Sequence, residues 1–301
     1  MWPNSMSWVV LALLSALALA TVDAVTKARM VSWSAERITF ARFFWTGLLL
    51  SPLWLIVDVP ALPPRFWGLV ALTIPLEVLA VIWSMRAIKL SPLSQAQPLL
   101  ALTPAFTALI GYLLLGERLT LLGVCGIILV VIGAYLLRWG GLLAAGPARS
   151  QSMIAPFVAL IREPGPRYML GVAAIYAVTT VFCKAALAYV PAMTFVVIYY
   201  TAMCLVTTLW FVWRESDAVH ALFEKPGAHF AVAILMAVMI ISHFLAMAQI
   251  EAAYMITVKR TSLLFSIFYG VLLFREGGLI RKLSAGMVML LGVYLVSSRL
   301  A

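Results

Sequence analysis

The sequence predicts an all-α polytopic membrane protein with ten transmembrane helices, arranged as a 5+5 inverted repeat. Three observations lead to this fold class. Of the 301 residues, 64% are hydrophobic and only 11% are charged, whereas a soluble domain is about half apolar and about a quarter charged. The apolar residues fall into long runs that Pro, Gly and charge clusters separate. The second half of the chain repeats a pattern of the first half.

Each apolar run is long enough for a helix that crosses a bilayer, which needs about 20 residues. The runs lack the alternation of polar and apolar residues that a membrane barrel needs. The expected spans of the first half cover 8–26, 36–57, 66–89, 93–115 and 120–138, and those of the second half cover 167–189, 192–213, 228–250, 254–274 and 279–298. The breaks carry turn-forming residues, such as VDVPALPP at 57–64 and REGG at 275–278.

The longest polar segment, 139–166, divides the chain into predicted halves of residues 1–138 and 167–301. Within it, Ile154, Phe157, Val158 and Ile161 fall on one helical face. This spacing is typical of a short amphipathic helix that lies on the membrane surface. A disordered link between the halves fits the same sequence, so both interpretations stay open.

The internal repeat is visible in GYLLLGERL, which begins at residue 111, and GVLLFREGGL, which begins at residue 270. An offset of 159 residues aligns Gly111 with Gly270, Glu117 with Glu276, Gly133 with Gly292 and Tyr135 with Tyr294. Five spans are an odd number, so the second copy enters the membrane from the opposite side, as in many secondary transporters. Acids at helix starts favour the helix dipole, so we expect Glu117 and Glu276 to be structural.

These residues also carry a family resemblance. The segment from AIKLSPLSQAQP to GAYLL, at 87–137, resembles the EamA-type repeat of the drug/metabolite transporter superfamily, with a Pro in span four, then Gly, apolar residues, Glu and a Gly-rich span five. The second copy resembles a subgroup with Lys-Arg at the start of span nine, but it has Leu263 where the first copy has Pro104. The resemblance implies two repeats, ten helices and a central cavity.

Charged groups within spans are costly, about 2.5–3.5 kcal/mol each on insertion scales, so they usually face a cavity or a partner. Glu77 lies in the middle of span three, two residues after Pro75. A proline frees a backbone carbonyl and can kink the helix. We expect Glu77 to bind a cation or to carry a proton, and a structural hydrogen bond to a neighbouring helix is the alternative.

Lys259 and Arg260 lie about two turns inside the run that becomes span nine. Two adjacent cations are suited to an anionic group such as carboxylate or phosphate. Alternatively, one side chain extends to the lipid headgroups and the other pairs with an acid. His243, in the middle of span eight, is a weaker candidate because a lone histidine is more often a packing residue.

Further candidates lie near the ends of spans. Asp23 and Lys27 are four residues apart, the spacing of an ion pair on one helical face, and Lys184 matches Lys27 in the second half. Arg42 resembles an Arg found in span two of many family members, and Tyr199 is a candidate for the cavity wall.

Span four contains four more candidates. Gln95 and Gln97 supply hydrogen-bond donors and acceptors at its start. Pro98 and Pro104 predict an irregular helix whose freed carbonyls line a cavity.

The net charge of +10 indicates basic loops next to the cytoplasm or lipid headgroups and not a nucleic-acid partner. Connections after odd-numbered spans hold 14 basic residues, and those on the other side hold four. The positive-inside rule therefore puts both termini outside, whereas the resemblance implies cytoplasmic termini. The sequence leaves this conflict open. The expected location is the bacterial cytoplasmic membrane.

We predict a secondary transporter, not an enzyme, that exports or exchanges a small polar or anionic metabolite by alternating access. Protons are candidate coupling ions. No cofactor or metal is expected, since the sequence has neither a GxxxxGK[ST] loop nor a metal-ligand motif. A membrane-embedded lipid-modifying enzyme and a scaffold or sensor without transport are the competing hypotheses. A homodimer is compatible with the sequence, but no strong GxxxG face indicates one.

Overall fold

A computed structural model of the chain describes residues 4–30, 32–91, 97–144, 163–214, 222–224, 226–274 and 279–297. Within these residues all regular structure is helical, as the sequence predicts. The first half contains α1 (Asn4–Met30), α2 (Ala35–Leu50), the 3₁₀ helix η1 (Ser51–Leu55), α3 (Pro64–Leu90), the 3₁₀ helix η2 (Gln97–Leu102), α5 (Thr103–Leu115) and α6 (Leu121–Ala144). The second half contains α8 (Pro164–Ala186), α9 (Ala192–Arg214), α11 (Pro226–Met247), α12 (Ala252–Lys259), α13 (Ser262–Phe274) and α14 (Leu279–Ser297).

Six of these helices are long and apolar enough to cross a membrane by length and composition. They are Ser7–Met30, Ala35–Leu55, Pro64–Leu90, Pro164–Ala186, Ala192–Trp213 and Pro226–Met247. Three shorter apolar helices, Leu99–Leu115, Leu121–Leu136 and Ser284–Ser297, correspond to expected spans four, five and ten. Expected span nine is divided into α12 and α13. The structure therefore supports a polytopic membrane protein.

Two spans are irregular, and only one of them was predicted. Span four, in which two prolines predict an irregular helix, begins as the 3₁₀ helix η2 and becomes α-helical at Thr103. Helix α3, in contrast, runs without interruption through Pro75. The break between α12 and α13 falls at Arg260 and Thr261. No Pro or Gly in this part of the sequence predicts it.

The predicted connector is shorter in the structure because helices take up both of its ends. Helix α6 extends to Ala144, beyond the expected end at 138, and α8 begins at Pro164. Proline is favoured at such a first position because its missing N–H has no helical partner there. The amphipathic helix expected around Ile154 to Ile161 lies outside the described residues.

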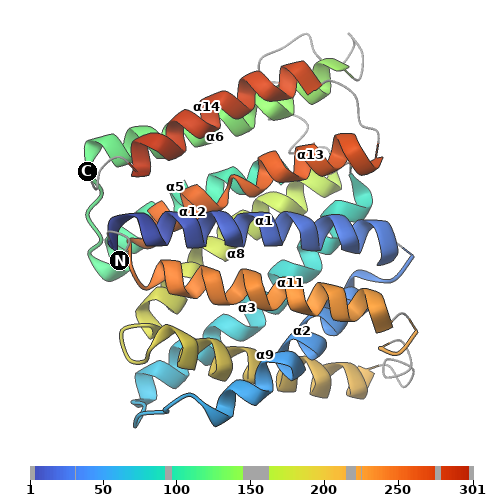
Figure 1. The fold of residues 1–301 in the computed structure, drawn as a ribbon, viewed down its shortest axis with the longest axis vertical. Coiled ribbons are helices and arrows are strands. Elements are labelled where there is room, and N and C mark those ends of the chain that lie inside the picture. Colours follow the sequence, from blue (N-terminus) through green and yellow to red (C-terminus); the bar gives the residue numbers. More distant parts are fainter. Residues whose placement is uncertain are drawn as a thin grey trace.

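The helices lie side by side across the view in Figure 1, with α6 and α14 at one edge and α2 and α9 at the other. Helix α1 begins and α14 ends at the same end of the bundle. The main contacts join α6 to α14, α2 to α9, α3 to α8 and α1 to α11. If the two halves are exchanged, this set of pairs is unchanged, because α1, α2, α3 and α6 of the first half correspond to α8, α9, α11 and α14 of the second.

The contact between α6 and α14 shows the same exchange at the level of single residues. A Cβ atom added to Gly126 would lie 2.6 Å from the carbonyl oxygen of Gly292, and one added to Gly133 would lie 2.9 Å from that of Ala285. With the offset of 159, Gly133 corresponds to Gly292 and Gly126 to Ala285. Each close contact is thus the counterpart of the other, and both need a residue without a side chain.

Candidate functional site

A cavity of about 120 Å³ lies in the middle of the bundle. Its wall comes from α1, α2, α3, η2, α8, α9, α11 and α12, so both halves of the chain contribute. Seven of the residues singled out in the sequence line it: Asp23, Arg42, Glu77, Tyr199, His243, Lys259 and Arg260. We call it the central cavity.

Lys259 holds its ammonium group against α11. Its Nζ lies 3.0 Å from His243 Nδ1 and 3.4 Å from the sulfur of Met239. An ammonium group has donors only, so the ring nitrogen that faces it accepts the hydrogen bond. Lys259 is 9% exposed, and neither of these contacts neutralises its positive charge.

Arg260 is the least satisfied cation of the site. It is 4% exposed, and its Nε has no hydrogen-bond partner among the described residues. It lies between α12 and α13, where two turn residues interrupt the α-helix. A buried guanidinium without an acid beside it is costly, and its fork of donors matches a carboxylate or phosphate.

Glu77 faces these cations from α3. Its carboxylate has Thr179 of α8 as a hydrogen-bonding neighbour, and Lys259 is close enough to interact with it through charge. Helix α3 is packed against α8 along its length, which brings Glu77 and Thr179 together. Glu77 therefore interacts with both a hydroxyl group and a cation. A proton or cation site and a structural hydrogen bond both fit this position.

Asp23 and Arg42 form an ion pair at the side of the central cavity. Arg42 Nη2 donates to Asp23 Oδ1 at 3.1 Å and to Thr26 Oγ1 at 2.7 Å. The Nε of Arg42 is buried and has no hydrogen-bond partner among the described residues. The spacing in the sequence suggested Lys27 as the partner of Asp23, and the structure adds Arg42 from the neighbouring helix.

With His243 neutral, the acids and bases of the cavity wall do not balance. Asp23 and Glu77 are the acidic side chains of the wall, whereas Arg42, Lys259 and Arg260 are basic. The cavity carries one more cation than anions, in a place where solvent screening is weak.

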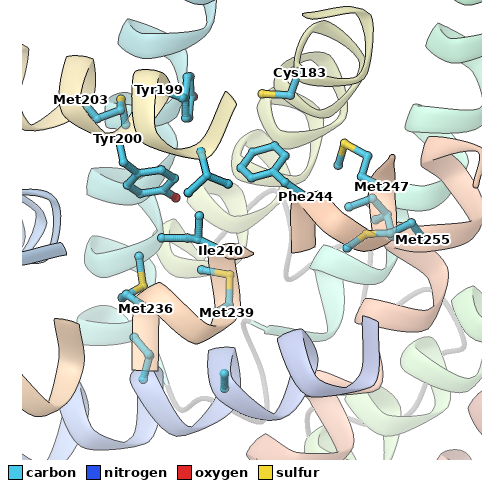
Figure 2. Packing of buried hydrophobic residues seen from close by; sticks show 14 of the residues in the cluster. Cys183, Tyr199, Tyr200, Met203, Met236, Met239, Ile240, Phe244, Met247 and Met255 are labelled. Atoms are coloured by element: carbon cyan, nitrogen blue, oxygen red, sulfur yellow. The ribbon is translucent and has the colours of Figure 1, made fainter. Parts of the chain in front are cut away.

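An apolar layer completes the wall on the side of α9 and α11. Figure 2 shows Tyr199 and Tyr200 of α9 opposite Ile240 and Phe244 of α11, with the Cys183 side chain of α8 beside Phe244. The ring centroids of Phe195 and Phe244 are 4.9 Å apart, and those of Phe195 and Tyr199 are 5.4 Å apart. Tyr199, Tyr200 and Phe244 form the cavity wall on this side.

Two of the expected residues instead bind main-chain groups at helix ends. Lys184 Nζ donates to the carbonyl oxygens of Met247 at 2.6 Å and Ile250 at 2.9 Å, at the end of α11. The Glu117 carboxylate accepts from the Ala252 N–H, at 3.2 and 3.3 Å, where α12 begins. Glu117 thus accepts a hydrogen bond from the first residue of a helix in the other half.

The spacing of Gly111 and Glu117 has a direct explanation. A Cβ on Gly111 would lie 2.9 Å from Glu117 Oε2, so the glycine leaves room for the carboxylate. Gly116 between them has φ +68° and ends α5 in the left-handed region, which glycine adopts at no steric cost. Burial raises the pKa of the Glu117 carboxyl above its ordinary value.

The remaining candidates are placed only in part. Gln97 and Pro98 are the first two residues of η2. Pro104 is buried at the start of α5, and Gly270 is buried in α13. Gln95 and Glu276 lie outside the described residues. Among the described residues there is no group of three or more His, Cys, Asp or Glu that is suited to a metal ion.

Several wall residues were not singled out in the sequence. Thr179 and Tyr176 of α8 and Met239 of α11 lie beside the charged groups. They are uncharged, and the sequence gives no reason to prefer them over similar residues elsewhere. The one available signal was their position, since Thr179 and Met239 are each four residues from another candidate or cavity residue on the same helix.

Comparisons with known proteins agree with this architecture. The profile of the EamA-like transporter family matches residues 6–139 and again residues 164–298. A solved crystal structure aligns over 96% of this chain and 96% of that chain, with a TM-score of 0.68 and 16% sequence identity, which supports the fold alone. No curated protein matches the chain.

Proposed function

The chain belongs to the EamA-like transporter family, and from this premise we propose that it is a secondary transporter for a small metabolite with an anionic group. The family places it among the membrane transporters of the drug/metabolite superfamily. The observation that carries the choice of substrate is Arg260, a buried guanidinium at the central cavity whose Nε has no partner among the described residues. Lys259 is beside it in the chain, so an anion has two cations within reach.

Alternating access is the proposed mode of transport, and the repeat supports it. The family profile matches twice, and the main helix contacts are unchanged when the halves are exchanged. Five spans in each half would make the second copy inverted, and the central cavity would lie where the repeats meet. The export or exchange of a metabolite then proceeds by rocking one half against the other around this cavity.

Glu77 is the proposed site for a coupling proton. It is the carboxylate of the cavity wall without a guanidinium partner, and a bound anion would compete with it for the positive charge of Lys259. If Glu77→Gln retained transport driven by a pH gradient in proteoliposomes, this role would be rejected.

The first experiment is a thermal-shift screen of the purified protein. Ligands that bind the native state raise its melting temperature, so carboxylates and phosphates are compared with amines and neutral analogues of the same size. We expect stabilisation by anions alone. The hits are then tested for uptake into proteoliposomes.

Arg260→Gln tests the proposed contact, with Arg65→Gln as the matched control. Arg65 is an exposed cation at the start of α3, outside the cavity wall. We expect Arg260→Gln to abolish the anion-induced shift and uptake, and Arg65→Gln to leave both unchanged. Stabilisation by amines, or a shift that survives Arg260→Gln, would contradict an anionic substrate.

The same assays distinguish the competing functions. A lipid-modifying enzyme would release a changed lipid and accumulate no solute, and a scaffold would show neither flux nor solute-dependent stabilisation. We propose the bacterial cytoplasmic membrane as the location. A reporter fused after residue 301 tests the orientation, since activity only on export would reject cytoplasmic termini.

A further inference from the structure

A second, smaller cavity of about 20 Å³ adjoins the central cavity. The two share Asp23, Arg42 and Met85 in their walls. The smaller one adds Thr26, Lys27 and Lys89. Because Lys27 and Lys89 lie in the last turns of α1 and α3, this cavity lies between the central cavity and that end of the bundle. We call it the outer pocket.

The Asp23–Arg42 ion pair lies between the two cavities, because both residues line both of them. Arg42 is 5% exposed and uses Nη2 for both Asp23 and Thr26. Its Nε is buried without a partner among the described residues. A carboxylate or phosphate bound to arginine normally takes two neighbouring donors of the guanidinium fork, so the present pair leaves a donor unused.

The outer pocket is also basic and fixed in place. Lys89 Nζ donates to the Trp33 carbonyl oxygen, which ties the end of α3 to the turn after α1. Lys27 adds a second ammonium from the last turn of α1. With Arg42 included, three cations surround a space whose wall contains a single acid, Asp23.

We propose that the outer pocket is a second binding site for an anionic group, and that the Asp23–Arg42 pair separates it from the central site. An anion held by the two lysines competes with Asp23 for Arg42. When it displaces Asp23, the guanidinium binds it through Nε and an Nη, and the path to Lys259 and Arg260 is open. When no anion is present, Asp23 compensates the buried charge of Arg42, which would otherwise be costly. This step rests on the proposed transport of an anion.

The second half of the chain has no such pair in the corresponding place. The offset of 157 that aligns Lys27 with Lys184 also aligns Gly47 with Cys204, and these two residues meet at the contact of α2 with α9. The same offset puts Thr180 opposite Asp23 and Tyr199 opposite Arg42. Aromatic side chains of α9 and α11 line the central cavity away from the ion pair, so the proposed control by an ion pair applies to one end only.

Cysteine labelling tests the outer pocket without any need for transport. Cys125 and Cys204 are replaced by Ser, and Cys183, in the wall of the central cavity, is kept as a reporter. A second protein carries Cys183→Ser and Ile88→Cys, because Ile88 lines the outer pocket. Each is labelled with an anionic and a cationic methanethiosulfonate of similar size.

For the outer pocket, we expect the anionic reagent to label Ile88→Cys faster than the cationic one by on the order of tenfold, the lower range for steering into a charged cleft. Lys27→Gln with Lys89→Gln should remove this preference. Arg118→Gln is the matched control, since Arg118 is an exposed cation outside both cavities. Sodium sulfate should slow the labelling more than sodium chloride of equal ionic strength. Equal rates for the two reagents would overturn the site.

For the ion pair, we expect Asp23→Asn to raise the rate at which the anionic reagent labels Cys183 by on the order of tenfold, because the competing charge is gone. Asp23→Glu, which keeps a carboxylate, should behave like the parent and shows that the substitution acts through charge. An unchanged rate in Asp23→Asn would overturn the role of the pair. If the labelling results hold and no solute is transported, the outer site stands and the proposed function fails.

Discussion

The contact between Gly111, Glu117 and the start of α12 gives a prediction that can be worked out in numbers. The Glu117 carboxylate accepts the Ala252 N–H, and a Cβ at residue 111 would lie 2.9 Å from its Oε2. We therefore expect Gly111→Ala to displace the carboxylate from Ala252. The effect of Gly111→Ala should depend on whether Glu117 is present.

Two terms set the size of this dependence. Removing the carboxylate from the start of α12 costs about 1 kcal/mol, as for other helix N-terminal caps. Alanine is about 1 kcal/mol better than glycine inside a helix, and Gly111 lies within α5. In the parent protein, the two terms for Gly111→Ala nearly cancel. In a Glu117→Ala background there is no carboxylate left to displace, so the same substitution should stabilise by about 1 kcal/mol.

The assay is a double-mutant cycle on purified protein in detergent, followed by thermal unfolding. Four proteins are compared: the parent, the two single variants and the double variant. The interaction energy of about 1 kcal/mol corresponds to a shift of about 2–4 °C for a large domain. Additive shifts within error, or a double variant less stable than Glu117→Ala, would refute the explanation of the Gly–Glu spacing.

Three further predictions concern the helix crossing, pH dependence and the lysine contact. Gly126→Val should destabilise by about 1–3 kcal/mol, as overpacking does, because its side chain would meet the Gly292 carbonyl; an unchanged melting temperature would contradict the close crossing. Burial raises the pKa of the Glu117 carboxyl, so the folded state favours its protonated form. The melting temperature of the parent should fall relative to that of Glu117→Gln as pH rises above the ordinary range of a glutamate, about 4.3, and parallel pH profiles would argue against this. His243→Leu removes the acceptor of Lys259 and should weaken the anion-induced thermal shift, whereas His243→Gln, which keeps an acceptor, should retain it.

The sequence predicted an all-helical polytopic membrane protein, because bilayer thickness requires long apolar helices. It also predicted the irregular start of span four, since proline lacks the N–H that a regular helix needs. The break after Lys259 was missed, because VKRTSL contains no Pro or Gly. The usable signal was two adjacent cations in an apolar run, which are hard to accommodate on a straight helix that lies against its neighbours.

Seven of the polar residues singled out in the sequence line the central cavity, and the cost of a charge in the membrane favours such an arrangement. What the sequence did not contain was the identity of the partners that these residues bind. Lys184 was a cavity candidate, yet its ammonium group binds the carbonyls at the end of α11. Asp23 has a partner, Arg42, in α2, and helix α11, which packs against both α1 and α2, brings these two helices together.

The two halves share residues at equivalent positions where helices pack against each other, which we call the frame, but they differ at the positions that line the central cavity. Residues that hold the frame are matched at one offset, as Gly133 is with Gly292 and Tyr135 with Tyr294. Residues with charge in the cavity are not: the same offset puts Met236 opposite Glu77 and Leu100 opposite Lys259. Both acids of the cavity wall belong to the first half, and the Lys-Arg pair belongs to the second.

This division has a consequence for the proposed mechanism. In alternating access the helix frame would switch between two arrangements in which equivalent helices of the two halves exchange roles. Because the frame residues of the two halves match, their packing should favour neither arrangement strongly. The balance is then set by the unmatched residues, and charge is the largest difference among them. Removing the Asp23–Arg42 pair changes one end of the proposed path and leaves the aromatic wall of α9 and α11 in place. We therefore expect Asp23→Asn to alter labelling at Cys183 from one face of the membrane only, which sided labelling in oriented vesicles would measure; an equal change from both faces would mean that the pair acts on the whole frame and not on one access path.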